Sequence, residues 1–209
     1  MNTDAEYIPD LSLWLGRRGV QDYAGAEPFA RLTAALRLLQ DRVVAARPPA
    51  DVVEAAAARL EEVARLLAEY AVEEPEQVAS RLMEEVGRGQ TLVPAIRVEF
   101  WDDCRVQGRM RFHRFHLGSN GAAHGGAISL FFDDLLGQLA NMPGHPRART
   151  ASIRVNYRRI IPIEHELVAR AEVVHREGRK LTIAGELRVA DVVVADAEGL
   201  FIQLRPDQK

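Results

Sequence analysis

The chain has 209 residues, which allows one domain with a large extension or two small domains. Its apolar share of 47% is sufficient for a sizeable core, and its formal charge of −3 gives no basis for nucleic-acid binding through a basic surface. The single cysteine, Cys104, excludes an intrachain disulfide and a cysteine-based zinc site, and it fits a reducing compartment.

The start of the chain is acidic and lacks the basic residues and apolar run of a signal peptide. No stretch of the sequence reaches the length of a membrane span. We therefore expect a cytoplasmic protein without a membrane or nucleic-acid partner.

Residues 1–90 show helical periodicity and no strand pattern, which predicts an all-helical N-terminal extension. A first helix is expected over 28–46, where Pro28 suits the first turn. A second helix is expected over 51–72, capped by Asp51, and a third, short helix over 74–87. Isolated helices could not bury the Leu, Val and Ala stripes of this segment, so we expect the extension to pack against the rest of the protein.

From about Pro94 the apolar residues alternate, as in half-buried strands. The pattern predicts two strands, then a glycine-rich loop and a buried helix up to about Asn141, and then four more strands, with Gly178 in a turn between two of them. Residues 91–209 are therefore expected to form an α+β domain, consistent with a curved antiparallel sheet around a long central helix. The expected strands are 96–101, 106–112, 150–157, 165–175, 180–189 and 192–204.

The segment from Asn120 to Asp133 carries the strongest functional signal. His124 lies between a loop containing Gly121 and the pair Gly125-Gly126, at the start of an apolar helix. Free N–H groups at a helix start can hold a developing negative charge, and a carboxylate on a core helix is costly to bury without a function. The combination indicates a site for attack on a carbonyl group.

The spacing of this segment predicts an oligomer. Gly125 and Asp133 are eight residues apart, which separates them by roughly 12 Å along one helix. An oxyanion donor and a base or nucleophile must each come within about 3 Å of one reacting carbonyl. If both groups act, one comes from each subunit, so we expect a homodimer or a dimer of dimers with shared sites.

The His-Gly-Gly motif followed by an aspartate nine positions after the histidine resembles the helix motif of hotdog-fold acyl-CoA thioesterases, in the branch that includes the phenylacetate-pathway and human thioesterase-superfamily enzymes. Thr150, by its spacing from Tyr157, resembles the Ser or Thr that supports the catalytic carboxylate in that family. The matching residues cover roughly 92–205. Asn120 departs from the pattern, because it lies four residues before His124 where the family has its asparagine about six before.

The resemblance implies a hotdog fold and hydrolysis of an acyl-CoA thioester, with coenzyme A as part of the substrate and no metal or redox cofactor. It implies that Asp133 acts as base or nucleophile, that Gly125 N–H is the oxyanion donor and that Thr150 assists. It also places Asn120, His124 and Gly126 next to the substrate.

Alternatives remain for several of these residues. Asp134 competes with Asp133, although the motif spacing favours Asp133. Asn120 can orient the substrate or be a turn residue, and Thr150 can support Asp133 or simply favour a strand. For His124 we favour a structural role at the start of the helix over that of a general base.

Two further groups of residues carry weaker functional signals. Arg154 is a candidate for binding the phosphates of coenzyme A, together with Arg158 and Arg159, although charges are also expected on a solvated strand face. His113 and His116 lack a third ligand in the sequence, so no metal site is predicted.

Two other functions share the fold. A non-catalytic hotdog module could bind acyl-CoA or a protein partner, with the helical extension as the interaction domain. An enoyl-thioester hydratase or dehydratase usually needs a histidine and an acid in a different arrangement.

Overall fold

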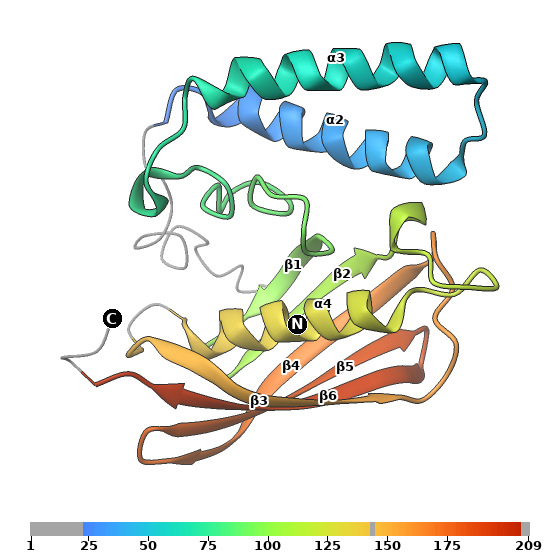
Figure 1. Cartoon of the computed structure of the whole chain (residues 1–209). Helices are drawn as coiled ribbons and strands as arrows, with labels where there is room; N and C mark the ends of the chain where they lie inside the picture. The colour runs from blue at the N-terminus through green and yellow to red at the C-terminus, as the bar shows by residue number, and fades with distance from the viewer. Residues whose placement is uncertain (1–22, 143–144, 206–209) are drawn as a thin grey trace, which may run out of the picture.

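The computed structural model describes residues 23–142 and 145–205 (Figure 1). Residues 1–22 of the predicted extension, and Pro143 and Gly144 in the chain break expected after the central helix, lie outside them. The helices are α2 (Ala26–Ala45), α3 (Ala50–Ala68) and α4 (Gly125–Ala140), with 3-10 turns η1 (Glu74–Glu76) and η2 (Arg114–His116). The strands are β1 (Ile96–Trp101), β2 (Arg105–Arg111), β3 (Ala148–Tyr157), β4 (Glu166–Glu177), β5 (Lys180–Val189) and β6 (Val192–Gln203).

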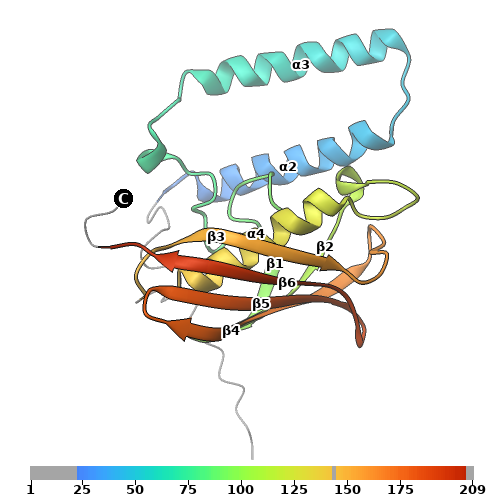
Figure 2. The same ribbon diagram turned by 60° about the horizontal axis from the view of Figure 1, so that its bottom comes forward.

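The six strands form one antiparallel sheet in the order β1-β2-β4-β5-β6-β3, and the sheet curves around α4 (Figures 1 and 2). All six predicted strands are present, and the predicted α+β hotdog arrangement is confirmed. Gly178 lies in the β4–β5 turn with a φ of +54°, a conformation that favours glycine.

The core lies between α4 and the inner face of the sheet. Inward side chains alternate along β5, as expected for a strand with one buried face. Gly185 on β5 lets the helix come close, because a Cβ there would lie 2.8 Å from the Leu136 side chain. The apolar stripe predicted for the helix is buried, with every member at most 3% exposed: Ile128, Phe131, Phe132, Leu135 and Leu139.

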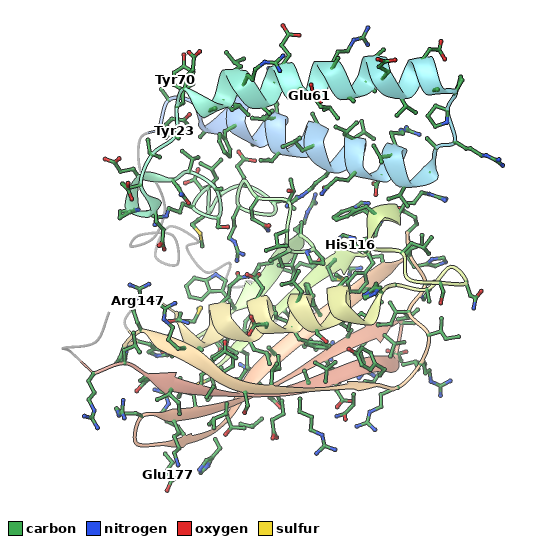
Figure 3. The ribbon with its side chains drawn as sticks, in the orientation of Figure 1. Tyr23, Glu61, Tyr70, His116, Arg147 and Glu177 are labelled. Atoms are coloured by element: carbon green, nitrogen blue, oxygen red, sulfur yellow. The ribbon has the colours of Figure 1, made fainter. Side chains whose placement is uncertain are left out.

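The extension lies over the side of α4 that faces away from the sheet, and its two helices differ in their contacts. Helix α2 packs near η2, where Asp41 Oδ1 accepts a hydrogen bond of 2.9 Å from the Phe115 N–H. Every residue of α3 is exposed, and Figure 3 shows Glu61 and Tyr70 far from the sheet. The expected packing of both apolar stripes against the core is therefore wrong for α3 within one chain.

Two local predictions in the extension are also wrong. The third helix is only the short turn η1, because Ser80, in the middle of the predicted range, has a left-handed φ of +67°, which interrupts a helix. Asp51 does not cap α3, since the helix begins at Ala50 and Asp51 falls in its first turn. A carboxylate there still interacts favourably with the helix dipole.

Within the described ranges, no helix combines the length and the apolar character needed to cross a bilayer.

Candidate active site

His124 is the N-cap of α4. Its backbone is extended, with φ −64° and ψ 132°, and its Nδ1 accepts a hydrogen bond of 2.9 Å from the Gly126 N–H. An Nδ1 that accepts an N–H carries no proton, so the neutral ring has its proton on Nε2. This geometry agrees with the structural role favoured for His124 and leaves Nε2–H as a donor toward the exposed side of the loop.

The cap leaves Gly125 as the available backbone donor. Gly125 is the first residue of α4, and its N–H makes no hydrogen bond to another residue in the described part of the chain. The N–H of Gly126 is already paired with His124. An unpaired N–H at the positive end of a helix dipole can stabilise an oxyanion.

Tyr157 forms hydrogen bonds with the first turns of α4. Its hydroxyl donates to the Gly125 carbonyl oxygen at 3.0 Å and lies 2.8 Å from Ser129 Oγ. A Cβ on residue 125 would lie 3.4 Å from this hydroxyl, which is in van der Waals contact range. The sequence carries no local signal that Tyr157 and Ser129 meet. Their pairing requires the register of β3 against α4, which no local pattern encodes.

Thr150 and Asp133 are brought together by a β-bulge. Residues on β3 alternate between the faces of the sheet, but the register shifts between Thr150 and Ser152, with Thr150 opposite Phe201. Phe201 is fully buried in the core, so Thr150 also faces the helix. Its Oγ1 donates to Asp133 Oδ1 at 3.0 Å. The Asp133 side chain is otherwise exposed, at the outer side of α4.

Asp134 has a different environment from Asp133. It forms a 2.6 Å ion pair with Arg88 of the extension and also accepts a hydrogen bond from Gln138, one turn along α4. The Arg88 side chain is 14% exposed. The structure thus separates the two neighbouring carboxylates, since Asp134 anchors the extension and Asp133 remains accessible.

The structure does not bring all of the other predicted substrate-binding residues close to Gly125 and Asp133. Asn120 lies in an exposed turn with a φ of +53°, which supports its interpretation as a turn residue. Arg154 pairs with Glu198 across the strands, on the outer face of the sheet. It lines a hollow of about 680 Å³ surrounded by charges of both signs, including Arg170, Glu172 and Glu186. This hollow is on the opposite face of the sheet from Asp133, and neither Asp133 nor Gly125 lines it.

His116 is a buried histidine near the loop that leads to α4. Its residue is 6% exposed, its Nδ1 accepts from the His113 N–H at 3.0 Å, and its carbonyl oxygen accepts from the His124 N–H at 2.8 Å. Burial lowers the pKa of its imidazole to about 4. A neutral, enclosed ring of this kind supports the loop and does not exchange protons with a substrate.

One protomer does not unite the two halves of the candidate site. Gly125 lies at the first turn of α4 and Asp133 two turns later, roughly 12 Å along the axis. Strand β3, which carries Thr150 and Tyr157, is at the end of the sheet and pairs only with β6 among the described strands. An unpaired strand edge is a template for association with another chain.

Comparisons with known proteins agree with this architecture. The thioesterase superfamily model matches residues 120–195, from the loop before His124 into β6. Acyl-coenzyme A thioesterase THEM4 of Bos taurus is 31% identical over 93 residues, which cover 44% of this chain and 38% of that protein. The Mus musculus protein of the same name is 33% identical over 96 residues, which cover 44% of this chain and 41% of its own length. The matches thus span less than half of these relatives.

A crystal structure of a thioesterase superfamily protein is similar over most of the chain, with a TM-score of 0.72 and 27% identity. The alignment covers 84% of this chain and 90% of the other. This share is larger than residues 91–209 alone could supply, so it includes part of the helical extension. The predicted resemblance to hotdog thioesterases is confirmed by these matches.

Proposed function

We propose that this protein is an acyl-CoA thioesterase that hydrolyses the thioester of its substrate to a free acid and coenzyme A. The observation that carries the proposal is the exposed Asp133 carboxylate, held by Thr150 on a helix that begins with an unpaired Gly125 N–H. Support comes from the thioesterase superfamily match and from relatives named acyl-coenzyme A thioesterases.

In this proposal Asp133 drives the attack on the thioester carbonyl. It either takes a proton from a water molecule that attacks the carbon, or attacks the carbon itself to form an anhydride that water then hydrolyses. The hydrogen bond from Thr150 fixes one carboxylate oxygen and leaves the other for the reaction. Both routes expel the thiolate of coenzyme A, which takes up a proton.

The carbonyl oxygen gains negative charge during the attack, and the Gly125 N–H stabilises it. Tyr157 orients this donor by holding the Gly125 carbonyl oxygen. The exposed His124 Nε2–H at the N-cap, and Gly126 in the first turn of α4, lie next to the substrate in this proposal. Arg154 is on the other face of the sheet, so its proposed contact is with the distant phosphates of coenzyme A and not with the thioester.

The complete site is formed by two protomers. Pairing of β3 edges in a homodimer, or in a dimer of dimers, brings Gly125 of one chain toward Asp133 of its partner. We also propose membership of the phenylacetate-pathway-like branch and a cytoplasmic location, the latter in keeping with the free, exposed Cys104.

Asp133→Asn tests the chemistry. We expect the turnover of acyl-CoA substrates, measured as thiol release, to fall on the order of 10²–10⁴-fold, because an amide is a poor base and nucleophile. Asp134→Asn is the matched control, since it changes the neighbouring carboxylate and should retain turnover once folded. Full activity in Asp133→Asn, or a larger loss in Asp134→Asn, contradicts the assignment. Tight acyl-CoA binding by the wild-type protein without any thiol release would instead favour a non-catalytic module.

Heterodimers test the shared site. Two inactive chains, one with Asp133→Asn and one with Gly125→Val, should recover part of the activity when they are co-expressed with different tags and purified as a mixed dimer. One of the two sites then has an intact Gly125 and an intact Asp133. If the mixed dimer is no more active than either folded parent, each site belongs to one chain.

A further inference from the structure

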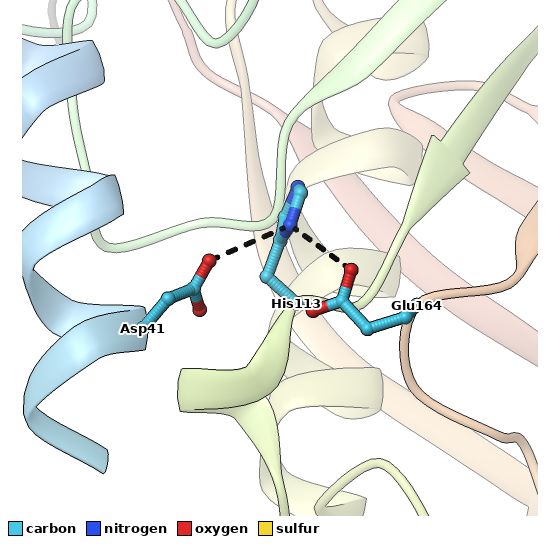
Figure 4. Close-up of side chains that lie close together, drawn as sticks. All are labelled: Asp41, His113 and Glu164. Carbon is cyan, nitrogen blue, oxygen red and sulfur yellow. Dashed lines mark ion pairs between the residues drawn. The ribbon is translucent and has the colours of Figure 1, made fainter. Parts of the chain in front are cut away.

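A cluster of three side chains at the junction between the extension and the sheet domain has no role in the proposed reaction. His113 is the residue before η2, Asp41 comes from α2 and Glu164 from the loop between β3 and β4 (Figure 4). The sequence offered His113 no third ligand, because Asp41 and Glu164 lie 72 residues before it and 51 residues after it. The fold brings both carboxylates to the same imidazole.

We propose that this cluster binds a divalent transition-metal ion such as zinc. His113 Nδ1 lies 3.7 Å from Asp41 Oδ2 and 3.7 Å from Glu164 Oε2, and the three donor atoms are all within 4.8 Å of one another. These gaps exceed an N–H···O hydrogen bond of about 2.7–3.2 Å. They are close to the spacing of roughly 3.4 Å between neighbouring ligands around tetrahedral zinc, so a small closure would complete the coordination.

The donor set favours such a metal over calcium or magnesium. One imidazole nitrogen with two carboxylates is a mixed nitrogen and oxygen set, which suits zinc and its neighbours, whereas calcium and magnesium prefer oxygen ligands alone. With a neutral imidazole, the two carboxylates carry a charge of −2 in close proximity. A divalent cation between them removes this repulsion.

Asp41 is already oriented for this role. Asp41 Oδ1 accepts the Phe115 N–H at 2.9 Å, which turns Oδ2 toward His113 and supplies the outer-shell contact common among metal-binding carboxylates. The His116 N–H donates both to the His113 side chain and, at 3.0 Å, to the His113 carbonyl oxygen. A cation at the imidazole nitrogen would replace the first of these two bonds, and the N–H would keep its bond to the carbonyl oxygen. His113 and Glu164 side chains are each 42% exposed, which leaves a path for the ion and room for a water ligand.

A bound ion would connect three elements that are far apart in the sequence. Because Asp41 is on α2, the ion would fasten the extension to the domain that contains α4. The proposal is independent of the thioesterase activity, and its test measures metal binding rather than turnover.

The test uses the full chain without a histidine tag, freed of metal with a chelator. We expect calorimetric titration with zinc to give about one ion per chain, the melting temperature to rise on zinc addition, and bound cobalt(II) to absorb visible light as a coordinated ion. Asp41→Asn, His113→Gln and Glu164→Gln should each weaken zinc binding at least 10-fold. Glu177→Gln, at the far end of β4 (Figure 3), should bind zinc like the wild type.

Three results overturn the proposal. One is the absence of stoichiometric zinc binding, and another is unchanged binding in both Asp41→Asn and Glu164→Gln. The third is a melting temperature that does not change when zinc is added but rises as the pH falls through the range where histidine takes up a proton. That result would show that a protonated His113 pairs with the two carboxylates and that no metal is needed. Glu164→Gln is nearly isosteric at a half-exposed position, so circular dichroism should confirm that this variant folds.

Discussion

Two amphipathic helices of similar length behave in opposite ways in this protein. Helix α4 buries seven side chains against the sheet, whereas α3 buries none. Both carry an apolar stripe at helical spacing, and both were predicted from it. The contrast shows that a stripe predicts a helix and the face that needs a partner, but not the identity of that partner.

The difference comes from what lies opposite each stripe. The sheet offers α4 a curved inner face of alternating apolar residues and glycines such as Gly185, which lets helix and strands approach closely. Helix α3 faces no strand, and its large apolar side chains remain open, with Leu66 59% and Val53 50% exposed. The site is accordingly built on the closely packed region, while the extension makes polar contacts with it at α2 and at Arg88.

The largest effect should come from the α4 core. Phe132→Ala should lower the free energy of unfolding by about 3–5 kcal/mol, because the ring is fully buried and its removal leaves a cavity. Urea denaturation followed by circular dichroism measures this loss. A cost below about 1 kcal/mol would mean that the helix does not depend on the core in the way its burial indicates.

Removal of the extension should have a smaller but clear effect. A chain that starts at Thr91 loses the partners of Asp134 and of the Phe115 N–H, so we expect it to lose about 2–3 kcal/mol of stability. Thermal melting, size-exclusion chromatography and turnover of a panel of acyl-CoAs compare the stability, oligomeric state and acyl preference of the truncated and full-length chains. If stability, oligomeric state and acyl preference are all unchanged, residues 1–90 are an autonomous module.

A single substitution isolates one of those attachments. Asp134→Asn removes the charge that pairs with Arg88, whose guanidinium remains mostly buried, and should cost about 1–2 kcal/mol. Arg88→Gln should cost a similar amount, and the double variant should cost less than the sum of the two. Additive losses in this double-mutant cycle would show that the pair is not coupled.

The smallest effect should come from α3. Leu66→Ala replaces an exposed residue with a strong helix former, so stability should change by no more than about 0.5 kcal/mol. The same denaturation measurement as for Phe132→Ala makes the two positions directly comparable. A loss above about 2 kcal/mol would show that this face of α3 is covered in solution, for instance by another copy of the chain.

The sequence alone determined the elements that depend on local periodicity. The strands, the buried stripe of α4, the Gly178 turn and the His124 motif all follow from the spacing of apolar residues and glycines, which a single segment carries. It also identified Asp133 and Thr150 as candidates. It did not predict the loss of the third helix, since the path of the chain there depends on long-range contacts such as the hydrogen bonds from Arg37 to the carbonyl oxygens of Val86, Gly87 and Gln90.

Only the tertiary structure decided which groups meet. The bulge on β3 turns Thr150 toward Asp133, the register of the same strand places Tyr157 beside Gly125, and the path of residues 82–90 brings Arg88 to Asp134. The cluster of Asp41, His113 and Glu164 depends on the packing of α2 against η2. These contacts join residues far apart in the chain, so their energies depend on the fold as a whole and leave no periodic signal in any one segment.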